Sequence, residues 1–492
     1  MILRAKHIDL STGNVLVAVL SQEDAAKLDV RGSDRIKIVY DGFEIIALVD
    51  VSKRGVKAGE IGLFSETFEK LGIKDGQQVK VYLEDKPKSI ATIRKKLLGD
   101  KLTKDEIYTL IKEIVKDELT DVELAYFVSA CTSHELTMEE TCNLTKAMVD
   151  FGTRLDLGNG KVVDKHSTGG VPNNRTTMLI VPIVAAAGLT MPKTSSRAIT
   201  SPAGTADTME VLAPVMHPVN KIKDIIRKTN ACIIWGGAMD LAAADDKMIR
   251  VRYPLSLDPE GLILSSIMAK KAAVGSKYVL IDIPLGKDTK VNTKDKAERL
   301  KKKFMHLGKE LGMKMHVMIS DGNQPVGCGI GPALEARDVL YILRGDKRGP
   351  EDLKKKAVYM AGLILKMAKV GDEKTASKIL DSGLAYEKMR EIIREQGGDP
   401  DVLPEDIIIG KHSYAVKATL NGKISDINNN NIAKIARIAG APFDRGAGLY
   451  LDVKIGDKVR KGDKLFTVYA ESSKKLDFTL EIFNKFPAVT VK

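Results

Sequence analysis

The segment that decides the fold of this chain reads Asp164-Lys165-His166-Ser167-Thr168-Gly169-Gly170. It follows Val162 and Val163, which predict the start of a β-strand, and it precedes a helical run that begins near Arg175. Lysine supplies positive charge, serine and threonine supply hydroxyl groups, and two glycines let backbone N–H groups approach an anion at a helix N-terminus. The GxxxxGK[ST] pattern of a P-loop is absent. The segment therefore predicts a phosphate or carboxylate site, with a plain glycine turn as the alternative.

A second polar segment reads Ser195-Ser196-Arg197-Ala198-Ile199-Thr200-Ser201-Pro202-Ala203-Gly204-Thr205-Ala206-Asp207. It places five hydroxyl side chains and one arginine in a short loop before an expected helix. Hydroxyl groups and backbone N–H groups at a helix start suit a tetrahedral oxyanion. Taken alone, the segment also fits a serine- and threonine-rich turn whose hydroxyl groups cap the helix, so both interpretations stay open.

The sequence around these two segments alternates between strands and helices. The runs Tyr278–Ile283 and His316–Ser320 are typical of strands, and helical stretches lie between them. Such an alternation predicts a central sheet that is covered by helices. This part of the chain is therefore expected to form a large α/β lobe.

Residues 87–158 favour helices instead. Three capping boxes occur in succession, and each precedes an amphipathic run. The pairs are Thr103 with Glu106, Thr120 with Glu123, and Thr137 with Glu140. Closely spaced helices with short connections predict a small helical lobe.

Residues 1–86 form a separate β-rich region. Short alternating strands recur, such as Arg35–Val39 and Gln78–Tyr82. The run Leu28–Ile38 aligns with Leu71–Val81, which indicates a faint internal repeat. We expect a β-barrel-like N-terminal module with pseudo-symmetric halves; the alternative is two ordinary turn–strand units that look alike by chance.

Short strands return from about residue 405 onward. The run Val453–Leu465 has the turn rhythm of a lipoyl- or biotinyl-type half-barrel, but no Met-Lys-Met attachment motif accompanies it. We therefore expect a structural C-terminal module of α+β half-barrel type. Within it, Asn428–Asn431 is expected to be a polar loop.

Composition and charge exclude several classes of protein. The chain has 492 residues and is 44% hydrophobic, which is enough for several packed domains. The formal net charge of +12 is spread along the chain, which favours a soluble surface and disfavours nucleic acid as a partner. The longest apolar stretch, Met178–Leu189, is too short to span a bilayer, so no membrane association is expected.

Cysteine and histidine usage points in the same direction. The four cysteines form no CxxC pair, and no signal peptide opens the chain, so we expect reduced thiols and a cytoplasmic location. The seven histidines are scattered without ligand spacing, so no metal is expected.

Together, the two polar segments resemble the paired phosphate motifs of the thymidine-phosphorylase family. Three further matches follow in the same order, and the resemblance extends from about residue 88 to the C-terminus. They are Leu241–Lys247, Ser266–Lys271, and Asp321–Gln324 with Glu335. A coincidence over five ordered motifs is very improbable, so the resemblance carries the expectations that follow.

The resemblance implies a multidomain α/β fold in which the helical lobe and the α/β lobe border the site and close over substrate. The N-terminal module then spans residues 1–86. The helical lobe takes residues 87–158 and a returning segment at 245–275. The α/β lobe takes 159–404 without that segment, and the C-terminal module takes 405–492. The family also implies a homodimer, which the N- or C-terminal module could extend into a larger homo-oligomer.

Departures from the pyrimidine-nucleoside members resemble the AMP phosphorylases of archaea. Val171–Arg175 replaces a small Gly-Asp element, Ser201–Ala203 replaces a His-Thr-Gly type sequence, and Pro284–Lys290 replaces a small glycine-rich loop. The additional N-terminal module points the same way. This branch acts on nucleoside 5′-monophosphates and releases ribose 1,5-bisphosphate. The resemblance therefore implies phosphorolysis of AMP, with CMP and UMP as further expected substrates, and no cofactor besides inorganic phosphate as co-substrate.

The family motifs, transferred residue by residue, imply a set of site residues. Asp258 matches the proton donor to the leaving base. The expected phosphate and substrate contacts are Lys165, His166, Ser167, Gly169, Gly170, Ser196, Arg197, Ala198, Ile199, Thr200, Ser201, Thr205, Ser266 and Lys290. Four further residues are expected nearby, namely Arg175, Thr176, Arg252 and Lys270. Added cationic residues such as Lys290 and Arg175 would neutralise the second phosphate of a nucleotide.

Three alternatives compete with this prediction. A pyrimidine-nucleoside phosphorylase would cleave thymidine or uridine. An enzyme of the anthranilate-phosphoribosyltransferase type would need an acidic cluster for magnesium diphosphate, which the sequence lacks. A catalytically inactive binding or assembly protein is disfavoured because Lys165, Ser167, Ser196, Thr205 and Ser266 are all intact.

Overall fold

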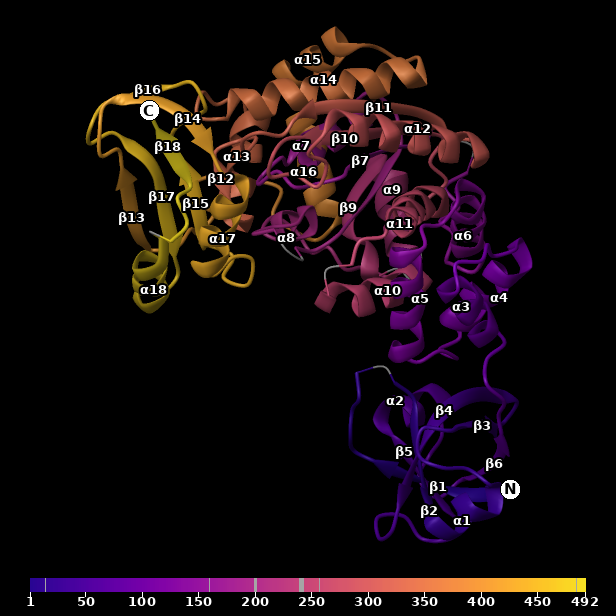
Figure 1. Cartoon of the computed structure of the whole chain (residues 1–492). Helices are drawn as coiled ribbons and strands as arrows, with labels where there is room; N and C mark the ends of the chain where they lie inside the picture. Colours follow the sequence, from indigo (N-terminus) through magenta and orange to yellow (C-terminus); the bar gives the residue numbers. More distant parts are fainter. Residues whose placement is uncertain (14, 159, 199–200, 239–242, 256, 484) are drawn as a thin grey trace. The chain divides into compact units, whose positions relative to one another are not determined.

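The computed structural model describes residues 1–13, 15–158, 160–198, 201–238, 243–255, 257–483 and 485–492 (Figure 1). Two compact units divide the chain. The first unit contains Met1–Gly152 and Ala243–Ser265, and the second contains Thr153–Ala242 and Ser266–Lys492. Along the sequence, the chain forms most of the first unit, then part of the second. It returns to the first unit at Ala243–Ser265 and then completes the second.

The N-terminal part of the first unit is a closed six-stranded barrel, as the alternating pattern predicted. Its elements are β1 (Ile2–Ile8), β2 (Val17–Ser21), α1 (Gln22–Leu28), β3 (Arg35–Tyr40), β4 (Phe43–Ser52), β5 (Glu60–Phe64), α2 (Ser65–Leu71) and β6 (Gln78–Leu83). Side chains of alternate strand positions fill the interior, for example Ile36 and Ile38 of β3, which are fully buried. The sequence did not reveal the two short helices, which are seven residues each.

The strand order confirms the internal repeat. The strands follow each other around the barrel as β1-β5-β2-β4-β3-β6. If β1 is exchanged with β4, β2 with β5 and β3 with β6, every strand keeps the same pair of equivalent neighbours. The exchange also relates the two parallel pairs, β1–β5 and β2–β4. Leu28 and Leu71, which begin the aligned runs, end the equivalent helices α1 and α2. The two halves therefore have the same local fold as well as similar sequences.

The helical part of the first unit contains α3 (Ser89–Leu97), α4 (Lys104–Val115), α5 (Asp121–Ser133), α6 (Met138–Asp150), α10 (Ala243–Arg252) and the start of α11 (Glu260–Ala273). Three of these helices, α4, α5 and α6, begin where the three capping boxes predicted. Thr103, Thr120 and Thr137 each cap a helix in a complete capping box. The apolar stripe of α4, which includes Ile107 and Ile111, is buried.

The second unit contains parallel strands that are covered by helices (Figure 1). Its elements before the C-terminal module are β7 (Val163–Ser167), α7 (Thr176–Ala186), β8 (Met191–Ser195), α8 (Thr205–Met209), α9 (Val219–Thr229), β9 (Ala231–Trp235), the end of α11, β10 (Tyr278–Leu285), α12 (Lys294–Glu310), β11 (Lys314–Asp321), β12 (Gly329–Ile330), α13 (Pro332–Leu343), α14 (Glu351–Ala368), α15 (Glu373–Asp381) and α16 (Leu384–Glu395).

The parallel strands form two hydrogen-bonded sets, so the predicted central sheet is not continuous. One set has the order β11-β10-β7, and the other pairs β8 with β9. A single parallel bridge between Val162 and Thr190 joins the sets at the start of β7 and β8. Beyond it, charged side chains on the two strands interact in place of a backbone ladder, among them Asp164 and Lys193.

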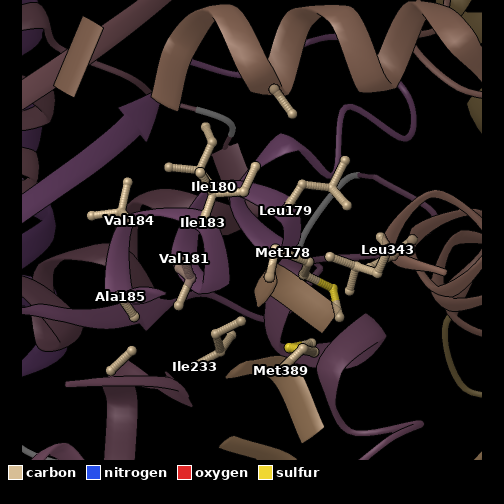
Figure 2. Close-up of a cluster of buried hydrophobic side chains, with 14 of the residues drawn as sticks. Met178, Leu179, Ile180, Val181, Ile183, Val184, Ala185, Ile233, Leu343 and Met389 are labelled. Atoms are coloured by element: carbon tan, nitrogen blue, oxygen red, sulfur yellow. The ribbon is translucent and has the colours of Figure 1, made fainter. Parts of the chain in front are cut away.

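The apolar run at Met178 forms the centre of the core of this unit. Helix α7 carries it, and Met178, Leu179, Val181 and Val184 are fully buried. Figure 2 shows these side chains in one cluster with residues from β9, α13 and α16. In the part of the chain that the structure describes, no helix is both long and apolar enough to cross a membrane.

The C-terminal module combines two antiparallel sheets with two helices. Its elements are β13 (His412–Lys417), β14 (Gly422–Ile427), α17 (Asn429–Ile438), β15 (Gly448–Leu451), β16 (Lys458–Val459), β17 (Lys464–Ala470), α18 (Ser473–Phe483) and β18 (Val489–Val491). The sheets have the orders β12-β15-β17-β13 and β16-β14-β18. Strand β12 of the preceding α/β part thus completes one of them.

One expectation for this module was wrong. Asn428–Asn431 is the start of helix α17 and not a loop. The side chain of Asn428 accepts a hydrogen bond from the backbone N–H of Asn431 at 2.8 Å and caps the helix. Asparagine favours both loops and N-caps, and here the buried face that contains Ile432 and Ile435 stabilises the helix.

Candidate anion-binding site

The two polar segments of the sequence lie at the same edge of the second unit. They follow the carboxyl ends of the neighbouring parallel strands β7 and β8. Ligands of open α/β sheets bind at this edge, because loops and helix N-termini meet there. Residues 165–170 are called the first loop below, and residues 195–205 the second loop.

Glycine conformation shapes the first loop. Gly169 and Gly170 have φ angles of +89° and +90°, which strain any residue with a Cβ atom. A Cβ atom on Gly170 would also lie 2.8 Å from Thr289 Cα and 2.9 Å from Lys290 N. The loop therefore packs closely on the turn after β10, and this contact brings the backbone of Lys290 beside Gly170.

Lys165, the first residue of the first loop, is buried. Its ammonium group donates hydrogen bonds to Thr176 Oγ1 at 2.9 Å and Thr177 Oγ1 at 3.4 Å, in the first turn of α7. Burial lowers the pKa of Lys165 to about 8, although the nearby Asp282 opposes the shift. Two of the expected site residues, Lys165 and Thr176, are thus in contact.

Asp282 of β10 holds the first loop from below. Its carboxylate accepts hydrogen bonds from Ser167 Oγ at 3.2 Å and Ser320 Oγ at 2.6 Å. Lys356 of α14 lies 3.1 Å away, and burial is outweighed by this lysine and Lys165, so the pKa of Asp282 is lowered. No sequence motif pointed to Asp282, although an acidic residue inside an apolar strand was the available signal.

A second buried carboxylate, Asp164, lies between two lysines. Its side chain is 2.7 Å from Lys271 Nζ and 3.5 Å from Lys193 Nζ. Burial alone would raise the pKa of Asp164, but the two ammonium groups outweigh it and keep the pKa below its ordinary value. Burial lowers the pKa of Lys193 to about 7. No sequence motif pointed to Lys193 either, a lysine within a short buried strand.

The charges around Asp164 also affect His166. Burial and the neighbouring lysines, Lys270 and Lys271 among them, lower the pKa of His166 well below its ordinary value. Its imidazole is therefore neutral at pH 7 and presents one donor and one acceptor. Lys270 and Ser266, both expected site residues, lie on α11 in the same unit, and Ser266 is buried.

Asp207 fixes the second loop. Its carboxylate accepts hydrogen bonds from the backbone N–H groups of Ala198 at 2.6 Å and Gly204 at 2.7 Å. A Cβ atom on Gly204 would collide with the backbone of Ser196, so the two ends of the loop are in close contact. Ile199 and Thr200, which were also expected to contact substrate, lie outside the described residues. Ser201 donates a hydrogen bond to the Ala203 carbonyl at 3.0 Å.

Arg197 interacts with its own part of the chain. Its guanidinium donates two hydrogen bonds to the Glu210 carboxylate, at 2.6 and 2.8 Å, and lies 5.2 Å from the ring centre of Trp235. The pKa of Arg197 is raised by its hydrogen bond to Glu210. The paired guanidinium offers less net charge to an anion than the sequence suggested.

Arg175 connects the two loops. It follows the first loop, and its guanidinium donates to Thr205 Oγ1 at 2.9 Å and to the Ala203 carbonyl at 2.6 Å in the second. It is also paired with the buried Glu335 of α13. Arg175 therefore ties the chain that follows the first loop to the second loop and to α13.

Asp258 and Arg252 belong to the first unit. Arg252 ends α10, and the exposed Asp258 precedes α11. The loops after β7 and β8 belong to the second unit. Among the residues that the structure describes, no group of three or more His, Cys, Asp or Glu side chains could hold a metal ion.

Comparison with known proteins gives the context of this geometry. The helical bundle domain of a glycosyl transferase family matches residues 90–152, and its a/b domain matches 159–386. The pyrimidine nucleoside phosphorylase C-terminal domain matches residues 423–486. These matches cover the helices of the first unit, both loops and most of the C-terminal module.

Relatives of similar length agree along nearly the whole chain. AMP phosphorylase 1 of Archaeoglobus fulgidus is 44% identical, over 98% of this chain and 96% of the relative. AMP phosphorylase of Pyrococcus furiosus is 46% identical, over 99% and 97% respectively. The chain belongs to the AMP phosphorylase family. A third member of the family, from Thermococcus sibiricus, is 47% identical over 96% of this chain and 94% of its own length.

A solved structure supports the fold at lower similarity. Anthranilate phosphoribosyltransferase from Thermus thermophilus matches with a TM-score of 0.51 and 18% identity. It covers 62% of this chain and 98% of its own, so about two fifths of this AMP phosphorylase family member lies outside the shared fold. At this identity the match concerns architecture only.

Proposed function

We propose that this enzyme catalyses the phosphorolysis of AMP to adenine and ribose 1,5-bisphosphate. The full-length similarity to proteins named AMP phosphorylase carries the proposal. In the reaction, a phosphate oxygen forms a bond to C1′ of the ribose while the C1′–N bond to the base breaks. The electron pair of that bond leaves with the base, which takes up a proton.

The two loops supply groups of suitable chemistry for inorganic phosphate. Lys165 offers a positive charge, and the N–H groups near Gly169 and Gly170 together with the hydroxyl groups of Ser196 and Thr205 offer hydrogen bonds. These groups are preorganised, because Asp282 holds the first loop and Asp207 and Arg175 hold the second. A fixed phosphate next to C1′ lowers the barrier through proximity and orientation.

Lys290 is our candidate for the nucleotide 5′-phosphate. Its backbone lies beside Gly170, so a long cationic side chain begins next to the first loop. Arg175 is a poorer candidate for this role, because its guanidinium is buried against Glu335 and its backbone does not lie beside Gly170. We therefore expect Lys290→Met to raise KM for AMP more than KM for phosphate.

Asp258 is proposed as the proton donor to the leaving base. A positioned general acid contributes a factor of roughly 10² to 10⁴ to a rate. Asp258→Asn should therefore lower kcat by about this factor and leave AMP binding nearly unchanged, as measured by calorimetry. Near-normal turnover in this variant would exclude Asp258 from the reaction.

Pyrimidine-nucleoside phosphorolysis is the second candidate, because the C-terminal domain match carries that description. Phosphate-dependent release of base should be measured from AMP, CMP, UMP, adenosine, uridine and thymidine under equal conditions. We expect AMP to react fastest, CMP and UMP to react more slowly, and a sugar bisphosphate to accumulate. Faster cleavage of nucleosides than of their 5′-phosphates would overturn the assignment.

We also propose a homodimer in the cytoplasm, with larger assemblies through the N- or C-terminal module. Cys131, Cys142 and Cys232 are buried and form no disulfide, which is typical of proteins from reducing compartments. Light scattering of the full chain and of forms that lack one terminal module would test the assembly. A monomer at all concentrations would exclude it.

A further inference from the structure

Arg175 is almost entirely surrounded by protein. Its side chain is 11% exposed, and that of its partner Glu335 is 0% exposed. Three separate elements use the guanidinium, namely α13 through Glu335, the second loop through the Ala203 carbonyl, and the start of α8 through Thr205 Oγ1. A rigid planar group with three fixed partners has very little freedom to turn toward a ligand.

Glu335 is itself fixed by other contacts. Its carboxylate accepts hydrogen bonds from the backbone N–H of Gly331 at 3.2 Å and from Thr208 Oγ1 at 3.1 Å. The pair of Arg175 and Glu335 is thus close to neutral and is anchored to α13 and α8. It contributes little net charge to a bound phosphate, but it determines where the guanidinium N–H groups point.

The hydrogen bond to Thr205 has a definite direction. A guanidinium can only donate, so Thr205 Oγ1 must accept the bond from Arg175. The single hydroxyl proton of Thr205 is then free to point elsewhere. Within the described ranges of the chain, no protein acceptor takes it. Thr205 is only partly buried and opens helix α8, at the end of the second loop.

We propose that Arg175 is a positioning residue that directs the Thr205 hydroxyl proton toward the bound inorganic phosphate. Donation from Arg175 also polarises the hydroxyl group, which strengthens the hydrogen bond that it donates in turn. The inference rests on the proposed function, because it assumes that phosphate is the anion between the loops. It assigns Arg175 to Thr205 and the attacking phosphate, and not to the second phosphate of the nucleotide.

A merely structural clamp would have different consequences. If Arg175 only held the loops together, its loss would weaken phosphate and nucleotide binding alike and would lower stability. If Arg175 acts through Thr205, its loss would weaken mainly the binding of phosphate. This effect would be seen only when the Thr205 hydroxyl group is present. A double-mutant cycle separates these cases.

The experiment uses the full chain with Arg175→Lys, Thr205→Val and the double variant, and with inorganic phosphate as the probe. Calorimetry without nucleotide gives Kd for phosphate, and steady-state kinetics give KM for phosphate and for AMP. Arg175→Lys keeps the charge next to Glu335 but loses the planar fork. We expect Kd for phosphate to rise about tenfold, as for loss of one charge-assisted hydrogen bond, and KM for AMP to change less than about twofold.

The Thr205→Val background supplies the decisive comparison. There, Arg175→Lys should change Kd for phosphate by less than about twofold, because no hydroxyl proton remains to be directed. In a Thr205→Ser background, which keeps the hydroxyl group, the tenfold rise should return. Equal losses in the valine and serine backgrounds would overturn the inference, as would an unchanged Kd in the single Arg175→Lys variant.

Two further measurements keep the outcome clear. Thermal unfolding identifies a variant that has lost its structure; in that case Arg175→Ala with added guanidinium ion replaces Arg175→Lys. Guanidinium should restore phosphate affinity when Thr205 is present but not in the Thr205→Val background, and restoration in both would overturn the inference. A wild-type enzyme that binds no phosphate would instead refute the proposed function.

Discussion

The first and second loops are polar, rich in hydroxyl groups and located at the same sheet edge, yet they are held in different ways. The first loop lies on buried ionised groups of the strands beneath it, namely Asp164 and Asp282 with their lysines. The second loop is fixed from its own helix by Asp207 and from the side by Arg175. The ionised groups under the first loop are almost fully buried, whereas Arg197 in the second loop is partly exposed.

The difference shows that two loops suited to the same kind of ligand can be stabilised by different interactions. Buried charges contribute strongly only while their partners are present, because an unpaired charge in the interior is costly. Backbone N–H groups capped by a carboxylate contribute about 1 kcal/mol each and fail more gradually. Substitutions at the first loop should therefore alter the stability of the fold and its pH dependence. Substitutions at the second loop should mainly alter the affinity for ligand.

Removal of the charge under the first loop should have the largest effect on stability. Asp164→Asn leaves Lys193 and Lys271 without a buried counter-charge, and the expected loss is about 3 to 5 kcal/mol. Asp207→Asn, the matched change in the second loop, should lose about 1 kcal/mol. Urea unfolding followed by the fluorescence of Trp235, the single tryptophan, measures both.

The pH dependence of this prediction has a defined sign. The pKa of Asp164 is lowered in the folded state, so its stabilisation is present above the ordinary carboxyl pKa and is lost as the pH falls through the folded value. The Asp164→Asn variant should approach the wild type only in acid. Equal losses for Asp164→Asn and Asp207→Asn at neutral pH would contradict the distinction between the loops.

Replacement of each glycine of the first loop by alanine distinguishes the effect of backbone strain from that of steric contact. Both residues have positive φ, so alanine costs about 1 kcal/mol of strain at either position. Only Gly170→Ala also meets backbone atoms, those of Thr289 and Lys290, whereas nothing lies within 4 Å at Gly169. We expect Gly170→Ala to raise KM for phosphate at least about tenfold more than Gly169→Ala. Similar values for the two variants would show that the contact with the turn after β10 has no role.

Phosphate capture by Lys165 should weaken in alkali. The pKa of Lys165 is lowered to about 8 by burial, so the ammonium group is charged below that pH and neutral above it. The value of kcat/KM for phosphate should therefore fall by up to about tenfold per pH unit above pH 8. At saturating phosphate, kcat should change less, because the bound anion holds the proton on the lysine.

The smallest effect is expected at Arg197. Its guanidinium is already paired with Glu210, and about a third of the side chain is exposed. Arg197→Lys should change stability by less than about 1 kcal/mol and KM for phosphate by less than about threefold. A tenfold rise in KM would show that Arg197 leaves Glu210 to bind substrate, and would make the second loop more similar to the first.

Much of the fold could be predicted from local sequence. The capping boxes at Thr103, Thr120 and Thr137 all formed. The two similar runs that end in Ile38 and Val81 lie in equivalent halves of the barrel. The capping asparagine at 428 was mistaken for a loop, because the same residue type serves both. The break between β7 and β8 was not predictable, since it depends on which strands pair at a distance.

In the candidate site too, local motifs could be predicted from the sequence, whereas contacts between distant residues could not. Both loops and Asp258 could be selected from motifs, but the partners of Arg175 and Arg197 could not. Arg175 and Glu335 are 160 residues apart in the sequence, and nothing local connects them. Asp282 and Lys193 were missed because one charged residue in a strand does not show which loop it lies under.

The sequence by itself determined the elements and the chemistry of the loops, because caps, strand alternation and glycine turns depend on residues within a few positions of one another. Only the tertiary structure decided which charges are available to a ligand. Ion pairs form between side chains that are distant in sequence, and burial sets their pKa values, so both properties arise only when the chain has folded.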